Sequence, residues 1–358
     1  MNKSKRILIV ILLFASSKSY SQWEQSMGTD NLDVQSLLST TDYLFFGGAT
    51  GAYRSGDDAY SFAYSNNGND DVGPTRGFAQ DENYIYTCTS QGVFRSSDMG
   101  VSWIPKSEGI TQFLSHGIIA TNGRLFLASL SGVFKSIDQG ETWISAGMIG
   151  IDTRSITCLQ DSILFVGTQG EGIFKSEDEG VSWQQVNNGL TSQNFRAIQA
   201  QGNAVFAGGQ NGTGVYRSTD FGNNWTLMSN GIASSSYRGF ASNEDFIFAG
   251  STSQGVFFSP DLGDNWIQLN EGLGDLNVFD LELNDTYIIA GTHSDGVYRF
   301  PIEELPNINV SISEINQINT RKRIKIVDLL GRECEEISNM ILIYIYDDGS
   351  AEKRVITD

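Results

Sequence analysis

The chain is poor in the residues that build disulfide frameworks and metal sites. Its 358 residues include three cysteines (Cys88, Cys158 and Cys334) and two histidines (His116 and His293). An odd number of cysteines at unrelated positions gives no disulfide framework, so we interpret them as buried small hydrophobic residues. Because no histidine and cysteine cluster has zinc spacing, the sequence predicts neither a metal site nor a cofactor.

Positive charge is also scarce. The chain has 23 lysines and arginines against 42 aspartates and glutamates, which gives a net charge of −19. A surface this acidic repels polyanions, which argues against nucleic acid and anionic membrane surfaces as general partners.

Long apolar runs are missing as well. The run at 7–15 is too short to span a bilayer, and it follows Lys3, Lys5 and Arg6. A basic start, a short apolar core and the small residues Ser19 and Ser21 are typical of a secretory signal peptide. We therefore expect residues 1–21 to be removed, and we expect no transmembrane segment.

Glycine is abundant (39 residues), and one glycine stands in each full copy of a repeated octet of pattern S-x-D-x-G-x-x-W. The copies are SSDMGVSW (96–103), SIDQGETW (136–143), SEDEGVSW (176–183), STDFGNNW (218–225) and SPDLGDNW (259–266), with a degenerate SGDDAYSF at 55–62. Their first residues are 40 to 42 positions apart. A fixed period of this length indicates one supersecondary unit that is repeated along the chain.

Each repeat contains short β-like runs separated by turn residues. In one unit these are 155–160, 163–168, 173–176 and the run that begins at Trp183. Four short strands per unit predict an all-β fold, a β-propeller. A seventh set, 279–300, lacks both an octet and a fourth strand. Because QWEQSMG (22–28) matches the WQQVNNG after an octet, we predict seven blades over 22–300, with the N-terminal strand closing the last blade.

The octet resembles the Asp-box, or BNR repeat, of sialidases and related propellers. The resemblance implies a structural turn in which the aspartate accepts turn N–H groups, the glycine allows a positive φ and the tryptophan packs between blades. The residues concerned are Asp98, Asp138, Asp178, Asp220, Asp261, Trp103, Trp143, Trp183, Trp225 and Trp266.

Beyond the repeats, residues 301–320 are predicted to be a linker and 321–358 a small C-terminal β-domain. The latter resembles the C-terminal sorting domain of type IX secretion cargo from Bacteroidetes, on the DLLGRE stretch with Gly331, the turn residues Asp348 and Gly349, and Lys353. The resemblance implies export by the type IX machinery, to a secreted or outer cell-surface location. The alternative is a β-domain that only stabilises the chain end.

The repeat also gathers the scarce cations. Aligning the blades puts Gln35, Arg76, His116, Arg154, Arg196, Arg238 and Phe279 at the start of the innermost strands. A second position, before each octet, holds Arg54, Arg95, Lys135, Lys175, Arg217, Phe258 and, by alignment, Arg299. We expect the second set to pair with acids. The first set either bonds to neighbouring blades or forms an anion-binding site at the mouth of the central channel.

Two functions compete on this scaffold. Sialidases, by resemblance, need an Arg-Ile-Pro motif that is absent, and xyloglucan-cleaving enzymes place their carboxylates between two propellers. The chain is more similar to single seven-bladed propellers of the photosystem II assembly-factor type, which bind without catalysing. We therefore predict a non-catalytic binding propeller for an extracellular glycan, peptide or protein, and assign no catalytic residue. The alternative is a glycan-active hydrolase that uses acids of the predicted top loops, Asp70, Asp71, Asp152, Glu171, Asp275 and Asp295.

Overall fold

The computed structural model describes residues 22–68 and 73–306, together with three C-terminal strands. The chain divides into two compact units, Met1–Leu305 and Pro306–Asp358. The predicted signal peptide, Asp70, Asp71, Cys334, Gly331, Asp348 and Gly349 lie outside the described residues. No helix of the described part is long and apolar enough to cross a membrane.

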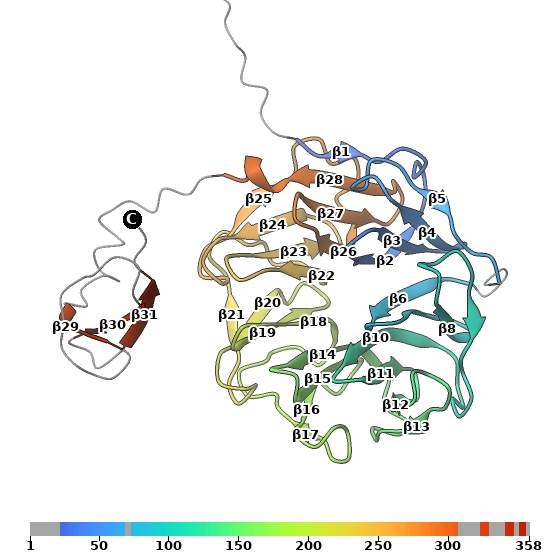
Figure 1. Cartoon of the computed structure of the whole chain (residues 1–358), viewed down its shortest axis with the longest axis horizontal. Coiled ribbons are helices and arrows are strands. Elements are labelled where there is room, and N and C mark those ends of the chain that lie inside the picture. Colours follow the sequence, from blue (N-terminus) through green and yellow to red (C-terminus); the bar gives the residue numbers. More distant parts are fainter. Residues whose placement is uncertain (1–21, 69–72, 307–322, 329–340, 347–350, 356–358) are drawn as a thin grey trace, which may run out of the picture. The chain divides into compact units, whose positions relative to one another are not determined.

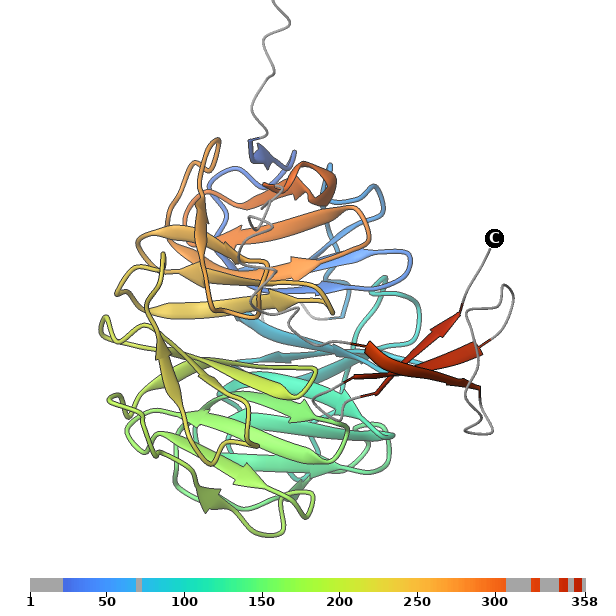
Figure 2. The same cartoon turned by 90° about the vertical axis from the view of Figure 1, so that its left-hand side faces the viewer.

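The first unit is a seven-bladed β-propeller, as the repeat predicts, and each blade is a four-stranded antiparallel sheet. The innermost strands are β2 (Val34–Ser39), β6 (Thr75–Gln80), β10 (Ser115–Thr121), β14 (Thr153–Leu159), β18 (Phe195–Gln201), β22 (Tyr237–Ser242) and β26 (Val278–Leu283). The second strands are β3 (Leu44–Gly48), β7 (Ile85–Thr89), β11 (Arg124–Ser129), β15 (Ile163–Thr168), β19 (Ala204–Gly209), β23 (Ile247–Ser251) and β27 (Tyr287–Thr292). Figure 1 shows the innermost strands arranged around the centre of the ring, and Figure 2 shows the blades from the side.

The outer half of each blade is completed by a third and a fourth strand. The third strands are β4 (Gly51–Ser55), β8 (Gly92–Ser96), β12 (Gly132–Ser136), β16 (Ile173–Ser176), β20 (Val215–Ser218), β24 (Gly255–Ser259) and β28 (Val297–Pro301). The outermost are β5 (Ala63–Tyr64), β9 (Ile104–Pro105), β13 (Ile144–Ser145), β17 (Gln184–Gln185), β21 (Thr226–Met228), β25 (Ile267–Leu269) and β1 (Glu24–Gln25).

The apolar core lies between neighbouring blades. Second strands such as β7 and β19 are buried along their whole length, because each is covered on both faces. One cluster joins Phe165 of the fourth blade to Tyr216 and Trp225 of the fifth. Burying aromatic and branched side chains between successive sheets therefore stabilises the ring blade by blade.

Ring closure follows the prediction. Strand β1 pairs with β28 through Glu24–Arg299 and Gln25–Tyr298. Trp23, just before β1, donates its backbone N–H to Glu271 O at 2.8 Å and its indole N–H to Leu269 O at 2.8 Å. The octet tryptophan Trp225 makes the two equivalent bonds to the blade before it. Trp23 therefore takes the place of an octet tryptophan in the last blade, which has no octet.

The propeller unit continues past the predicted boundary at residue 300. A short 3₁₀ turn, η1 (Ile302–Glu304), follows β28, and Leu305 packs against the core of the last blade. In the second unit, β29 (Arg323–Asp328), β30 (Ile341–Tyr346) and β31 (Ala351–Val355) form an antiparallel sheet in that order. The predicted hairpin between the last two strands is present.

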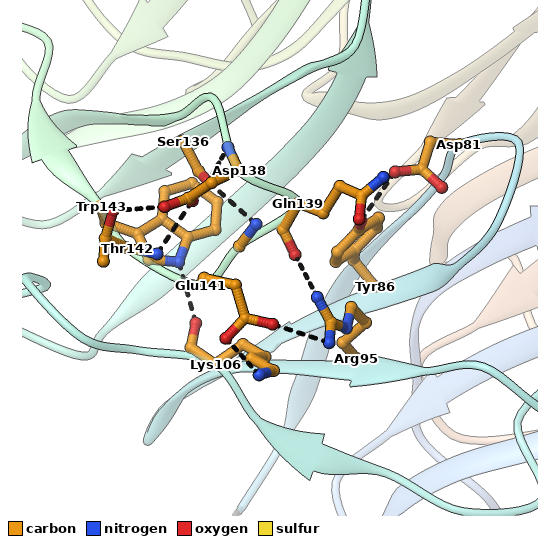
Figure 3. Close-up of polar contacts among 11 residues, drawn as sticks. Asp81, Tyr86, Arg95, Lys106, Ser136, Asp138, Gln139, Glu141, Thr142 and Trp143 are labelled. Atoms are coloured by element: carbon orange, nitrogen blue, oxygen red, sulfur yellow. Dashed lines mark hydrogen bonds and ion pairs between the residues drawn. The ribbon is translucent and has the colours of Figure 1, made fainter.

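The octet forms the turn between the third and fourth strands. In the third blade, Asp138 accepts the N–H of Thr142 at 2.9 Å and its hydroxyl at 2.6 Å, and Ser136 donates to the same carboxylate at 2.8 Å (Figure 3). These hydrogen bonds, led by that from Thr142, lower the pKa of Asp138. Gly140 has a φ of 82°, as the sharp turn requires.

The octet tryptophans differ in burial. Trp103, Trp143, Trp225 and Trp266 are buried, whereas Trp183 is only half-buried. Exposed residues flank it at Val181 and Ser182 and at Gln184. Its indole still donates to the preceding blade, at Ala146 O, over 2.7 Å.

The cations before each octet mainly hold the octet of the next blade. Arg95 donates to the carbonyl of Gln139 at 2.8 Å, a residue held at a φ of 58°, and forms an ion pair with Glu141 at 2.9 Å (Figure 3). Arg54, Arg217 and Arg299 donate to the matching carbonyls of Met99, Leu262 and Asp58. In the sixth blade this position is Phe258 instead of a cation, and the blade that follows has no octet for a cation to hold. These arginines thus bind a backbone carbonyl of the next octet, in addition to the acid pairing that was predicted.

Candidate anion-binding site

Every innermost strand contains a β-bulge at the same place. The pairing skips one residue at Val34/Ser36, Thr75/Gly77, Ser115/Gly117, Thr153/Ser155, Phe195/Ala197, Tyr237/Gly239 and Val278/Asp280. The skipped residues are Gln35, Arg76, His116, Arg154, Arg196, Arg238 and Phe279. A bulged residue leaves the ladder and changes the direction of its side chain. Because of the bulges, these seven side chains do not follow the alternation of side chains between the two faces of each strand.

All seven bulge residues line one cavity of about 270 Å³ at the centre of the ring. The fold therefore brings together Gln35, Arg76, His116, Arg154, Arg196 and Arg238, the residues of the predicted site. We call this cavity the channel mouth.

Neighbouring innermost strands lie close together next to the bulges. The residue after each bulge is small in six blades: Ser36, Gly77, Gly117, Ser155, Ala197 and Gly239. A Cβ on Gly239 would lie 2.6 Å from the Cα of Asp280, so the strands leave no room for a side chain there. The seventh blade places Asp280 at this position.

Two of the four arginines have clear partners. Arg154 forms an ion pair with Asp152, which is also 3.5 Å from Nε2 of His116. The guanidinium carbon of Arg238 lies 3.5 Å from the centre of the Phe279 ring, a cation–π contact. Arg238 also donates to Oε1 of Gln35 at 3.5 Å.

The other two arginines are less compensated. Within the described residues, Arg76 and Arg196 make no ion pair and no hydrogen bond through their side chains. The Nε atoms of Arg76, Arg154 and Arg196 are buried without a hydrogen-bond partner among those residues. A buried donor without an acceptor costs about 1–3 kcal/mol, so these atoms are suited to an acceptor supplied from outside the chain.

The arginines act on one another and on His116. Burial, together with the positive charge of Arg196, lowers the pKa of Arg238 to about 10. Burial also lowers the pKa of Arg196. The pKa of His116, whose side chain is 6% exposed, falls to about 3 through burial and through the charges of Arg154 and Arg76. His116 is therefore neutral at neutral pH, and the net field in the channel mouth is positive.

Two carboxylates also line the channel. Burial raises the pKa of Asp280 to about 7 and that of Glu282 to about 8. Asp280 accepts the backbone N–H of Leu37 at 2.8 Å, and the charge of Arg238 opposes the rise of its pKa. Both acids come from β26, so no described carboxylate lining the cavity faces them from another blade.

The acids of the top loops serve the local structure. Asp275 accepts the N–H and the hydroxyl of Ser294 at 3.0 and 2.9 Å. Asp295 accepts the phenol of Tyr298 at 2.5 Å. Asp152 is held by Arg154, as described above. The carboxylates of Asp152, Asp275 and Asp295 are therefore already engaged in hydrogen bonds or ion pairs.

Solved structures share this fold. No protein-family profile matches the chain, and no curated protein matches it. The extracellular domain of BT4673 from B. thetaiotaomicron matches with a TM-score of 0.66 and 14% identity, over 95% of this chain and 48% of that one. The GH74 enzyme of Niastella koreensis matches with a TM-score of 0.60 and 17% identity, over 76% of this chain and 43% of the enzyme.

A third likeness covers nearly all of a smaller protein. YCF48 bound to D1 peptide matches with a TM-score of 0.63 and 12% identity, over 79% of this chain and 97% of YCF48. The chain spans less than half the length of the GH74 and BT4673 chains. At these identities the comparisons show the fold alone, and they include an enzyme, the extracellular domain of BT4673 and a propeller bound to a peptide.

Some residues of the site were not predicted. Sequence reasoning found the bulge residues but missed Asp280 and Glu282, and it placed neither His293 nor Asp33. His293 stacks on Phe279 with ring centres 4.6 Å apart and contacts Asp33 at 3.0 Å. The only sequence signal for Asp280 is that the residue after the bulge is small in the other six blades.

Proposed function

We propose that this chain is a non-catalytic binding propeller that holds an anionic group of its ligand in the channel mouth. The observation that carries the proposal is the set of three buried arginine Nε atoms without partners, around one cavity in an otherwise acidic protein. Guanidinium groups that repel one another at close range are stabilised by a bound anion. The ligand classes we expect are acidic glycans, peptides and proteins.

The glycan-active hydrolase remains the second candidate, favoured by the likeness to GH74 enzymes. Glycoside hydrolysis commonly requires two carboxylates on either side of the scissile bond. The described carboxylates that line the cavity, Asp280 and Glu282, are both on β26. This arrangement supports binding rather than hydrolysis.

We further propose that the octets are Asp-box repeats and that the protein is exported. Five full octets at blade period, each at the same turn, support the first proposal. The resemblance of 321–358 to type IX sorting domains and of 1–21 to signal peptides supports the second. Export by this route delivers the propeller outside the cell or onto its surface.

The binding proposal is tested with the double variant Arg196→Ala, Arg238→Ala. Calorimetry with acidic glycans and peptides is expected to show binding by the wild type and at least a tenfold loss in the variant. The matched control is Lys106→Ala, Arg124→Ala, which removes two positive charges away from the channel mouth and is expected to leave affinity unchanged. Equal binding by wild type and a folded Arg196, Arg238 variant would show that these arginines are structural. A polysaccharide hydrolysis assay on the wild type tests the second candidate.

A further inference from the structure

The charge balance of the channel mouth indicates how many negative charges the ligand group carries. Four guanidiniums line the cavity, and within the described residues Asp152 compensates Arg154. Asp33 and Asp280 act electrostatically on Arg238. Arg76 and Arg196 then remain without an anionic partner among the described residues. These two unpaired guanidiniums, with Glu282 mostly protonated at neutral pH, leave two positive charges for the ligand.

The distribution of the donors among the blades indicates the shape of the group. The unpartnered Nε atoms of Arg76, Arg154 and Arg196 belong to β6, β14 and β18, and Nε2 of His116 on β10 joins them. Four adjacent blades thus present donors from successive positions around the axis. A carboxylate offers its two oxygens in one plane and suits a single arginine fork. A tetrahedral group offers oxygens in several directions and suits donors from several blades.

The remaining features of the cavity fit the same group. Its volume of about 270 Å³ far exceeds the roughly 30 Å³ that one water occupies in the liquid, so a four-oxygen anion has room. His116 is neutral, so it can donate or accept one hydrogen bond without adding charge.

We propose that the anionic group bound in the channel mouth is a tetrahedral dianion, a phosphate group, either free or as a monoester. This inference rests on the binding function proposed above and specifies its ligand. Arginine recognises phosphate through charge-assisted hydrogen bonds, and several forks can share the oxygens of one phosphate.

Calorimetry on the full chain at pH 8 with four small probes separates shape from charge. Phenyl phosphate is a tetrahedral dianion, phenyl sulfate a tetrahedral monoanion and malonate a dianion with planar groups, while inorganic phosphate tests the free form. We expect phenyl phosphate or inorganic phosphate to bind at least tenfold more tightly than both phenyl sulfate and malonate. The stronger of the two phosphate probes identifies the ester or the free anion as the ligand.

The outcomes keep the two proposals apart. Malonate binding as tightly as the phosphates would overturn the tetrahedral shape, and phenyl sulfate binding as tightly would overturn the double charge. Either result leaves the anion site in place. Failure of all four probes, together with failure of acidic glycans and peptides, would overturn both proposals. Arg196→Lys, which keeps the charge and loses the fork, is expected to weaken phosphate binding at least fivefold, whereas Arg124→Lys is expected to have no effect.

Discussion

At the scale of the residue, one position per blade decides the chemistry of the channel mouth. The bulge takes each of these side chains out of the regular alternation of an innermost strand. Because the blades are repeats, the same position recurs around the axis, and arginines far apart in sequence come together. Arg76 and Arg238 are 162 positions apart, yet the charges of both act on His116.

The first prediction concerns Asp280 and pH. Its pKa is raised in the folded protein from 3.8 to about 7, so between these values the unfolded chain releases this proton first. Its contribution to the free energy of unfolding therefore falls as pH rises from about 4 to about 7 and then levels. The charged groups that act with it are Arg238, which favours its ionised form, and Glu282, whose own pKa is raised.

The measurement is urea unfolding of wild type and Asp280→Asn across this pH range. We expect the variant to gain stability relative to wild type as pH rises, because it has no charge to bury. A difference between the two proteins that does not change with pH would contradict the raised pKa.

The second prediction compares two octet tryptophans. Trp225 is 4% exposed and its indole donates to Val186 O, so Trp225→Ala is expected to cost about 3–5 kcal/mol of unfolding free energy. Trp183 makes the equivalent bond but is half-buried, so Trp183→Ala is expected to cost less. Urea unfolding measures both. Equal losses would show that burial does not govern the role of the octet tryptophan.

The sequence allowed the bulge residues to be predicted because each is repeated, whereas Asp280 occurs once. A residue type that recurs in every blade indicates what the fold requires. A residue that differs in one blade gives no recurring pattern from which its role can be predicted. The raised pKa of Asp280 comes from its burial in the folded ring, which no residue spacing specifies.

At the scale of the element, the cations on the third strands connect successive blades. Arg217 of β20 donates to Leu262 O at 2.6 Å and pairs with Asp264 at 2.8 Å. The carbonyl it reaches lies at the left-handed residue of the next octet, with a φ of 57°. The octet of one blade is therefore supported by the blade before it.

The third prediction follows from this link. Arg217→Ala is expected to lower the free energy of unfolding by about 1–2 kcal/mol, because it removes a charged donor from a carbonyl. Arg124→Ala, whose arginine makes a more exposed ion pair with Glu179, is expected to cost below about 1 kcal/mol. Chemical denaturation of both variants is the measurement. A cost for Arg217 no larger than that for Arg124 would contradict a role in joining blades.

The fourth prediction concerns the closing strand. Deletion of residues 22–28 removes β1, Trp23 and the pairs with Arg299 and Tyr298. The edge of β28 then lacks its neighbour, and the apolar surface of Phe300 loses the indole 5.5 Å away. We expect a clearly lower melting temperature by circular dichroism. An unchanged melting temperature would show that closure does not stabilise the ring.

Element order was predictable because strands and turns repeat, but strand lengths were not. Trp183 was expected to begin a full outer strand, and β17 holds only Gln184 and Gln185. The outer strand pairs on one side only, so little in its local sequence determines where pairing stops.

At the scale of the whole molecule, the two ends of the chain carry the proposed export route. The fifth prediction is that removing residues 321–358 in the native host leaves the propeller in the periplasm. Immunoblots of cell fractions and medium are the measurement. A matched variant that replaces only residues 307–320 with a flexible sequence of equal length is expected to be exported normally. Unchanged export of the truncated chain would remove the type IX proposal.

The pairing of β1 with β28 has a mechanical consequence. The first and last strands of the ring meet in one blade through two residue pairs, Glu24–Arg299 and Gln25–Tyr298. A pull on the two ends of the propeller therefore loads this short latch before any other blade. A translocation motor or an unfolding protease that grips either end would meet this latch first, and opening it would expose the edge of β28.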